Sequence, residues 1–346
     1  MNLDALSKIA VAMVAPGKGI LAADESSSTI KKRFDAIGVE STADNRRDYR
    51  EMLFRTKEAM EKYISGVILY DETIRQTAKD GTPLVKLIEQ AGSIPGIKVD
   101  AGAKAHAAFP GEQITEGLDG LRERLADYHK LGARFAKWRA VIDIGRGGSA
   151  AIPSWGSIRA NAHALSRYAA LCQEAGIVPI VEPEVLMDGD HDIDRCFEVT
   201  ELTLKTLYAE LFEARVALEG TILKPNMIIA GKKCAKQASA SEIAEKTVRC
   251  FRRTVPSAAP GIVFLSGGQS DEDATANLNA MNAGYRHVMP WALSFSYGRA
   301  LQAAPQKAWS GKAENVAAGQ RAFAHRAKMN SLAQLGEWSD GLENVA

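Results

Sequence analysis

The stretch Thr221-Ile222-Leu223-Lys224-Pro225-Asn226-Met227-Ile228-Ile229 places one charged residue, Lys224, in an otherwise almost apolar run. A short apolar run of this kind is typical of a strand that is buried on both faces, as in a parallel sheet. A lysine in such a strand has to reach solvent, pair with a carboxylate or lose its proton. An uncharged lysine amine is a nucleophile that can form a Schiff base with a carbonyl group. Taken alone, the segment favours the simpler interpretation of a lysine that extends from the strand end to solvent.

Similar short apolar runs recur along the 346-residue chain and alternate with longer segments of helical periodicity. The predicted strands are Gly19–Ala23, Gly66–Tyr70, Gly96–Val99, Arg134–Trp138, Ile177–Val181, Thr221–Leu223, Gly261–Leu265 and Val288–Phe295. The predicted helices cover roughly 43–63, 83–91, 118–131, 156–175, 193–218, 240–254 and 271–283, and candidate helix caps include Ser239 or Ser241, and Ser270. Strands that alternate with helices in this way predict an α/β fold of the (β/α)8 TIM-barrel class. A doubly wound open sheet is the alternative.

Three segments are interpreted separately from this repeat. The N-terminal segment is expected to form a helix whose inward face consists of Leu3, Leu6, Met13 and Val14. The tail from about residue 305 to 346 has a polar, helical pattern, so we interpret it as an appendage of one domain that spans residues 1–346. The glycine-rich stretch 145–154 is interpreted as a loop.

Composition limits the possible functions. The formal net charge is +1 and the two signs are mixed along the chain, which gives no indication of nucleic-acid binding. No apolar run reaches the length of a transmembrane helix, so no membrane partner is expected. The six histidines have no metal-ligand spacing, and no C-x-x-C pair occurs among Cys172, Cys196, Cys234 and Cys250. We therefore expect no metal site and no cofactor, in a protein of the reducing cytoplasm.

Polar residues follow the predicted strands at the end where a (β/α)8 barrel places its active site. They are Asp24-Glu25-Ser26, Lys98 and Asp100, Lys137 and Arg139, Glu182 and Glu184, Lys224, Ser266-Gly267-Gly268, and Ser296-Tyr297-Gly298-Arg299. Residues two positions apart share one face of a strand, so these pairs would converge if that face is the barrel interior. Stability alone explains such a gathering poorly, because buried ion pairs often gain little net stability.

Together these groups suit a Schiff-base reaction. A lysine near other cations has its ammonium form disfavoured, and Lys137 and Arg139 would supply that field around Lys224. Glu182 would transfer protons as the amine adds to a ketone and water leaves. Glycine lets backbone N–H groups approach a phosphate closely, so the candidate anion-binding groups are Lys98, Arg299 and the turn Ser266-Gly267-Gly268.

Longer motifs carry these residues. They are Ala15–Ser26, Phe135-Ala136-Lys137-Trp138-Arg139, Val181-Glu182-Pro183-Glu184, Leu223-Lys224-Pro225-Asn226-Met227, Leu265–Ser270 and Ser296–Ala300. From about residue 10 to residue 330 the chain closely resembles class I fructose-bisphosphate aldolase, the metal-free type that works through a Schiff base. Each motif alone is weak, whereas the combination is very specific.

The resemblance implies a catalytic role for several residues. Lys224 would form the Schiff base with carbon 2 of fructose 1,6-bisphosphate or dihydroxyacetone phosphate, and the iminium would act as the electron sink when the bond between carbons 3 and 4 breaks. Asp24 would take the proton from the carbon 4 hydroxyl. Glu182 would be the acid and base of imine formation and hydrolysis, and Lys137 and Glu184 would complete the charge network.

The resemblance also implies two sites for the ends of the sugar phosphate. The phosphate on carbon 1 would be bound by Ser266, Gly267, Gly268, Ser296, Gly298 and Arg299. The other end of the sugar would be bound by Ser26, Thr29, Arg33, Arg46, Lys98 and Arg139. Members of the family are usually cytoplasmic homotetramers, and the same is expected of this chain.

The sequence departs from the family pattern in two places. Members commonly end in a tail whose terminal tyrosine assists proton transfer at carbon 3, whereas the last tyrosine here is Tyr297. The loop 145–157 looks longer than usual.

Two alternatives to a fructose 1,6-bisphosphate aldolase stay open. One is a Schiff-base enzyme for another sugar phosphate, such as fructose 1-phosphate or a seven-carbon bisphosphate, and the other is an inactive barrel that serves as a binding protein.

Overall fold

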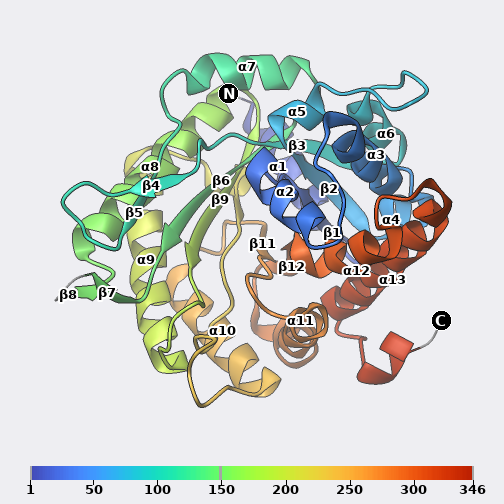
Figure 1. The fold of residues 1–346 in the computed structure, drawn as a ribbon. Helices are drawn as coiled ribbons and strands as arrows, with labels where there is room; N and C mark the ends of the chain where they lie inside the picture. Colours follow the sequence, from blue (N-terminus) through green and yellow to red (C-terminus); the bar gives the residue numbers. More distant parts are fainter. Residues whose placement is uncertain (1, 148–149, 345–346) are drawn as a thin grey trace.

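Eight parallel strands form a closed barrel in this structure, a computed structural model that describes residues 2–147 and 150–344. The strands are β1 (Gly19–Ala23), β2 (Ile64–Leu69), β3 (Ile94–Lys98), β6 (Phe135–Ile142), β9 (Val178–Val185), β10 (Ile222–Leu223), β11 (Gly261–Phe264) and β12 (Ala292–Tyr297). Their order is β1-β12-β11-β10-β9-β6-β3-β2, and β1 pairs with both β12 and β2, which closes the barrel (Figure 1). The predicted (β/α)8 class is confirmed, and the open-sheet alternative is wrong.

Helices surround the strands. Their bounds are α1 (Leu3–Met13), α2 (Ser27–Asp35), α3 (Ala43–Phe54), α4 (Lys57–Lys62), α5 (Asp71–Ile74), α6 (Leu84–Gln90), α7 (Leu121–Lys130), α8 (Trp155–Glu174), α9 (Ile193–Glu213), α10 (Ala240–Thr254), α11 (Asp271–Tyr285), α12 (Arg299–Trp309) and α13 (Val316–Leu335). Figure 1 shows α8 and α9 on one side of the strands and α12 and α13 on the opposite side. None of the helices in the described residues has the length and apolarity that crossing a membrane requires.

Capping side chains fix where two of these helices begin. Ser239 Oγ accepts a hydrogen bond from the backbone N–H of Glu242 at 3.2 Å, so Ser239 rather than Ser241 caps α10. Ser270 Oγ accepts in the same way from Asp273 N at 3.0 Å and caps α11. Each cap pairs a backbone N–H that the helix itself leaves unpaired. The caps therefore start α10 and α11 directly after the loops that follow β10 and β11.

The barrel interior changes from apolar to polar along the strands. Its apolar end is a cluster that includes Ile20, Ala22, Phe135, Val178, Ile180, Ile222 and Val263. Alternate residues of a strand point to the same face, so the next inward positions on these strands are Asp24, Lys137, Glu182 and Lys224. The strand periodicity thus places an apolar plug beneath a layer of charged side chains.

Gly96 makes room for the largest side chain of that plug. A Cβ atom at Gly96 would lie 2.3 Å from Phe135 Cε2, a distance that real atoms do not tolerate. Phe135 is fully buried in the barrel. Interiors pack at nearly crystalline density, so the glycine on β3 and the phenylalanine on β6 form a matched pair.

Several predicted element bounds were wrong. The predicted helix 43–63 is two helices, α3 and α4, with a break at Arg55–Thr56. The predicted helix 193–218 ends at Glu213, and a 3-10 turn covers Leu218–Gly220. The predicted strand Val288–Phe295 begins only at Ala292, because Arg286–Val288 form a 3-10 turn. A short apolar run does not by itself show where a strand begins, which explains the last error.

The predicted loop 145–154 contains a hairpin. Its strands β7 (Gly145–Gly147) and β8 (Ala150–Ile152) pair antiparallel, and residues 148 and 149 lie outside the described residues. A second antiparallel pair, β4 (Ala103–Ala105) with β5 (Gln113–Thr115), also lies outside the barrel. The prediction of a loop was therefore wrong for β7 and β8, and the two glycines of β7 hide the usual strand periodicity there.

The N-terminal helix α1 packs through a shorter face than predicted. Leu6 and Met13 are buried as expected, and Val14 just beyond the helix is also buried. Leu3 is 39% exposed, so its predicted inward position was wrong. The buried residues of the helix are Leu6, Ala10 and Met13, so its packed face begins at Leu6.

The segment from residue 305 onward, predicted to be a helical appendage, contains the end of α12 and all of α13. Helix α13 contacts α3, α4, α11 and α12. It buries Phe323 and Ala327, and Asn330 Oδ1 accepts a hydrogen bond from Thr275 Oγ1 at 2.9 Å. This part of the tail therefore belongs to the helical shell, and the single domain over residues 1–346 stays a prediction.

Candidate active site

The carboxyl ends of the strands surround a pocket of about 240 Å³. The residues that line it are Ala22, Asp24, Glu25, Ser26, Thr29, Arg33, Lys98, Lys137, Arg139, Glu182, Glu184, Lys224, Leu265, Ser266, Gly267, Ser296, Gly298 and Arg299. Every predicted site residue is therefore in one pocket except Arg46 and Gly268. The prediction that polar strand ends converge is confirmed.

Lys224 lies inside the barrel. It follows β10 directly, and its backbone N–H donates to the carbonyl oxygen of Val181 on β9 at 2.8 Å. Only 4% of Lys224 is exposed, and its Nζ lies 3.4 Å from Glu182 Oε1. The interpretation of a strand-end lysine that extends to solvent is therefore wrong.

Glu182 is shared between two lysines. Lys137 Nζ on β6 lies 3.3 Å from Glu182 Oε2 and 2.7 Å from Asp24 Oδ2. Both Lys137 and Glu182 are buried. Four strands, β1, β6, β9 and β10, thus supply a chain of alternating charge that runs from Asp24 through Lys137 and Glu182 to Lys224.

This chain fixes the charge of two of its members. Burial acts to raise the pKa of Asp24, but Lys137 and Lys224 outweigh it and hold the pKa well below its usual range. Burial acts to lower the pKa of Lys137, but Asp24 and Glu182 outweigh it and raise the pKa above its usual value. At neutral pH Asp24 is a carboxylate and Lys137 is an ammonium group.

Arg139 occupies the pocket differently from the sequence-based expectation. Its Nε donates to Glu184 Oε2, so the guanidinium pairs with that carboxylate. Burial acts to lower the pKa of Arg139, and the charge of Glu184 outweighs it and raises the pKa. Lys137 is therefore the cation next to Glu182 and Lys224, whereas Arg139 lies toward the pocket mouth with 42% of its side chain exposed.

One end of the pocket has the features of an anion site. Ser266 and Gly267 follow β11, and Gly267 has a φ of +57°, a left-handed conformation that favours glycine. Ser296 is 1% exposed, and its Oγ has no hydrogen-bond partner among the described residues. A buried polar atom without a partner is costly, so this hydroxyl suits a ligand oxygen. Arg299, in the first turn of α12, supplies a positive charge.

Two further cations line the same pocket. Arg33 on α2 donates to Glu25, and Lys98 Nζ lies 2.7 Å from Asp100 Oδ1. Ser26 caps α2, and its Oγ accepts from Thr29 N at 3.4 Å. Arg33 and Lys98 are held by neighbouring carboxylates, so each can be oriented before a ligand binds.

Arg46 is not part of this pocket. Its Nε donates to Glu72 Oε2 at 2.8 Å, and its Nη1 donates to the carbonyl oxygen of Ser41 at 2.6 Å. Arg46 therefore lies outside the pocket in this structure, and its contact with the sugar stays a prediction. The first turns of α3 direct this guanidinium toward α5, where it is fully paired.

Gly268 is also outside the pocket. Its backbone N–H donates to Met187 Sδ at 3.0 Å, and the residue lines a separate cavity. The loop turns at Gly267, so Ser266 and Gly268 face opposite sides. The sequence motif alone does not show which of the two cavities each residue of this loop lines.

Glu25 lines the pocket and was named among the polar strand ends, but no role was predicted for it. It is 6% exposed and accepts hydrogen bonds from Arg33 Nη1 and from Gln302 Nε2 at 2.7 Å. Its carboxylate is also 3.5 Å from Arg50 Nη2, a side chain that is 1% exposed. Its position between Asp24 and Ser26, at the end of an apolar strand, was the available signal.

Within the described part of the chain, no group of three or more His, Cys, Asp or Glu side chains could hold a metal ion.

Comparisons with known proteins agree on one family. The family model described as fructose-bisphosphate aldolase class-I matches residues 5–346. A probable fructose-bisphosphate aldolase class 1 of Xanthomonas campestris is 59% identical over 339 residues, which cover 98% of this chain and 99% of that protein. The cytoplasmic isozyme of Spinacia oleracea is 54% identical over 329 residues, which cover 95% of this chain and 90% of that protein.

A solved structure agrees as well. The fructose-bisphosphate aldolase of Plasmodium falciparum, in complex with TRAP and a small-molecule inhibitor, matches with a TM-score of 0.94. It is 48% identical, and the match covers 98% of this chain and 96% of that one. This chain belongs to the class I fructose-bisphosphate aldolase family.

Proposed function

We propose that Lys224 forms the Schiff base through which this aldolase reversibly cleaves fructose 1,6-bisphosphate into dihydroxyacetone phosphate and glyceraldehyde 3-phosphate. The observation that carries the proposal is the buried Lys224 amine, 3.4 Å from a carboxylate that also lies 3.3 Å from Lys137. A buried lysine in contact with a carboxylate can lose its proton to that group and become a nucleophile.

Glu182 transfers the protons of imine formation. The Lys224 amine adds to carbon 2, and a C–N bond forms as one proton of the nitrogen passes to the carbonyl oxygen, which becomes a hydroxyl. Glu182, which carries the proton that Lys224 gave up earlier, then protonates this hydroxyl. The C–O bond breaks, water leaves, the nitrogen lone pair completes the iminium, and Glu182 is a carboxylate again. The neighbouring Lys137 ammonium supports this role because it stabilises Glu182 each time the carboxylate regains its charge.

Asp24 is the base of carbon–carbon cleavage. The electron pair of the bond between carbons 3 and 4 moves into the iminium, and the carbon 4 hydroxyl gives its proton to the Asp24 carboxylate as the aldehyde forms. The lowered pKa keeps Asp24 ionised and ready to accept. Lys137, 2.7 Å from Asp24, positions the carboxylate for this step.

The two sets of cations in the pocket favour a bisphosphate. Arg299 with Ser266, Gly267 and Ser296 would bind the phosphate on carbon 1, while Arg33 and Lys98 would bind the other. A bisphosphate should therefore have a higher kcat/KM than fructose 1-phosphate. Equal values for the two sugars would contradict the second phosphate site and favour the monophosphate alternative.

Borohydride reduction tests the central step. Protein incubated with dihydroxyacetone phosphate and reduced should carry the substrate mass on the peptide that contains Lys224. The variant Lys224→Met should carry no adduct and lose essentially all turnover, since the covalent route disappears. An adduct on another lysine, or loss of wild-type activity in excess EDTA, would contradict the proposal.

We further propose that the protein is a cytoplasmic homotetramer. The relative from Spinacia oleracea is named a cytoplasmic isozyme. Large hydrophobic side chains on α8 and α9 are exposed, namely Trp155, Leu202 and Phe212. Exposed apolar surface of this kind commonly marks a contact with another subunit.

A further inference from the structure

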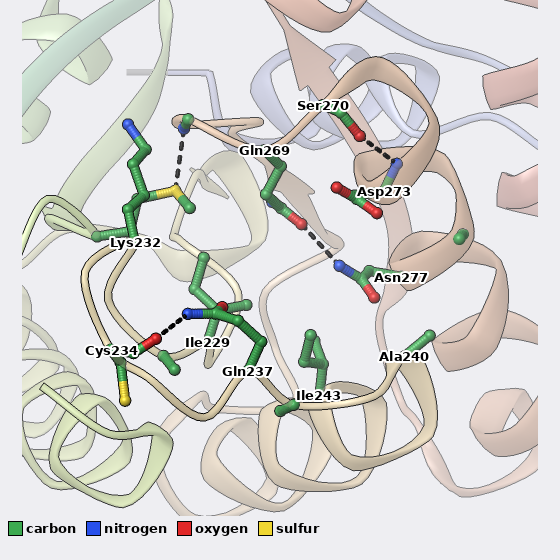
Figure 2. A pocket seen from close by; sticks show the side chains of 15 residues that line it. Ile229, Lys232, Cys234, Gln237, Ala240, Ile243, Gln269, Ser270, Asp273 and Asn277 are labelled. Atoms are coloured by element: carbon green, nitrogen blue, oxygen red, sulfur yellow. Dashed lines mark hydrogen bonds between the residues drawn. The ribbon is translucent and has the colours of Figure 1, made fainter. Parts of the chain in front are cut away.

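The loop Leu265–Ser270 separates the active-site pocket from a second cavity of about 440 Å³ (Figure 2). Leu265, Ser266 and Gly267 line the active-site pocket, whereas Gly268, Gln269 and Ser270 line the second cavity. The far side of the loop that is proposed to bind the carbon 1 phosphate therefore faces open space instead of packed core. Its position depends on the few side chains that cross from other elements.

Hydrogen bonds supply part of this support. Gln269 Oε1 accepts from Asn277 Nδ2 on α11 at 2.7 Å (Figure 2). Within the loop itself, Gln269 Nε2 donates to the carbonyl oxygen of Ser266 at 3.2 Å. Gly268 N–H donates to Met187 Sδ at 3.0 Å, and a thioether is a weak acceptor. The segment Gly267–Gly268 is therefore held less firmly than Gln269.

Lys232 supplies a further contact with this segment. A Cβ atom at Gly268 would lie 1.9 Å from Lys232 Cε and 2.0 Å from Lys232 Nζ, so the lysine chain occupies the space that a side chain at 268 would need. The ammonium lies 2.9 Å from Asp188 Oδ1, and Lys232 N donates to the carbonyl oxygen of Met187 at 2.7 Å. Lys232 thus connects the loops after β9 and β10 to the loop after β11.

We propose that Lys232 is a positioning residue for the carbon 1 phosphate, an inference that rests on the proposed function. Its alkyl chain covers Gly268 and keeps the loop from moving into the cavity behind it. The ion pair contributes less, because 39% of the Lys232 side chain and 65% of Asp188 are exposed. Loss of the alkyl chain should therefore weaken binding of a phosphate on carbon 1 more than loss of the charge.

The two products of the reaction distinguish the two phosphate sites. In the condensation direction, dihydroxyacetone phosphate uses the carbon 1 site, and glyceraldehyde 3-phosphate uses the other. Lys232→Ala should raise the KM for dihydroxyacetone phosphate about three- to tenfold, while the KM for glyceraldehyde 3-phosphate and kcat stay within about twofold. Lys232→Met should have a smaller effect, and the matched control Lys233→Met, whose exposed side chain neighbours Lys232 on the same loop, should have none.

A double variant tests the steric contact directly. Gly268→Ala should displace the Lys232 side chain and raise the KM for dihydroxyacetone phosphate as Lys232→Ala does. Because Lys232→Ala removes the clashing atoms, Gly268→Ala should add little in that background. Additive effects would overturn the inference, as would an unchanged KM in Lys232→Ala or an equal rise for both products. Borohydride trapping on Lys224 in each variant shows whether the proposed function itself holds.

Discussion

At the scale of single residues, Glu182 is the position on which the proposed chemistry depends most. It is the carboxylate that both buried lysines share, with Lys224 and Lys137 at 3.4 and 3.3 Å. Glu184, two positions further along β9, faces the same pocket but pairs with Arg139. The same strand therefore offers one carboxylate that contacts the nucleophile and one that does not.

Glu182→Gln should lower kcat by about two to four orders of magnitude, because general acid–base catalysis typically contributes that much. Borohydride trapping of dihydroxyacetone phosphate should slow in parallel, since imine formation is the step that loses its proton carrier. Glu184→Gln is the matched control and should reduce the trapping rate far less. Equal trapping rates for the two variants would show that Glu182 is not the proton carrier.

Asp24 makes the stability of the protein depend on pH. Its pKa is lower in the folded protein than the ordinary value of 3.8, because Lys137 and Lys224 outweigh burial. Such a group stabilises the fold above its unfolded pKa, and this contribution is lost as the pH falls toward the folded value. The difference in free energy of unfolding between wild type and Asp24→Asn should stay constant from neutral pH to about 4.5 and shrink below about 3.8. Urea unfolding across this range measures it, and a difference that grows on acidification would contradict the assignment.

At the scale of elements, the strand pattern was predictable because short apolar runs that alternate with helical segments are local signals. The end at which polar residues gather was also predictable, since Lys137 and Arg139, like Glu182 and Glu184, are two positions apart on a strand. The sequence could not show which side of a loop each of its residues faces. Gly268 is next to Gly267 in sequence, yet its N–H points to Met187 from a different loop. The position of Arg46 outside the pocket could not be predicted for a similar reason, because its partner Glu72 is 26 positions away in sequence.

The fit between β3 and β6 gives a test at this scale. Gly96→Ala should lower the free energy of unfolding by about 1–3 kcal/mol, because overpacking a filled core forces neighbours out of position. The added Cβ would meet the Phe135 ring at 2.3 Å. Gly284→Ala on α11 is the control: nothing lies within 4 Å of its Cβ, and alanine should stabilise the helix by up to about 1 kcal/mol. Denaturant unfolding measures both. The smaller Phe135→Leu should partly rescue Gly96→Ala, and a lack of rescue would show that the strain lies elsewhere.

At the scale of the whole molecule, the charged residues of the site and the exposed apolar side chains lie on different parts of the protein. The charged chain from Asp24 to Lys224 is enclosed at one end of the strands, and the formal net charge of the chain is +1. The outer surface of α8 and α9 instead leaves large apolar groups exposed, above all Phe212, which is 80% exposed. Exposed apolar surface does not stabilise a monomer. Its burial between subunits would favour association, because the hydrophobic effect is the main favourable term in most protein–protein contacts.

Phe212→Asp should therefore shift the proposed homotetramer toward smaller species. A charge at an apolar contact has to be desolvated when subunits associate, whereas the same change on a free surface alters stability by less than about 0.5 kcal/mol. Light scattering should give four times the 37.3 kDa of the chain for wild type and a lower mass for the variant. The control Glu213→Lys changes charge at the adjacent position without removing an apolar group and should keep the wild-type mass. A wild-type monomer would disprove the tetramer, and a variant that keeps the wild-type mass would place the subunit contact on another face.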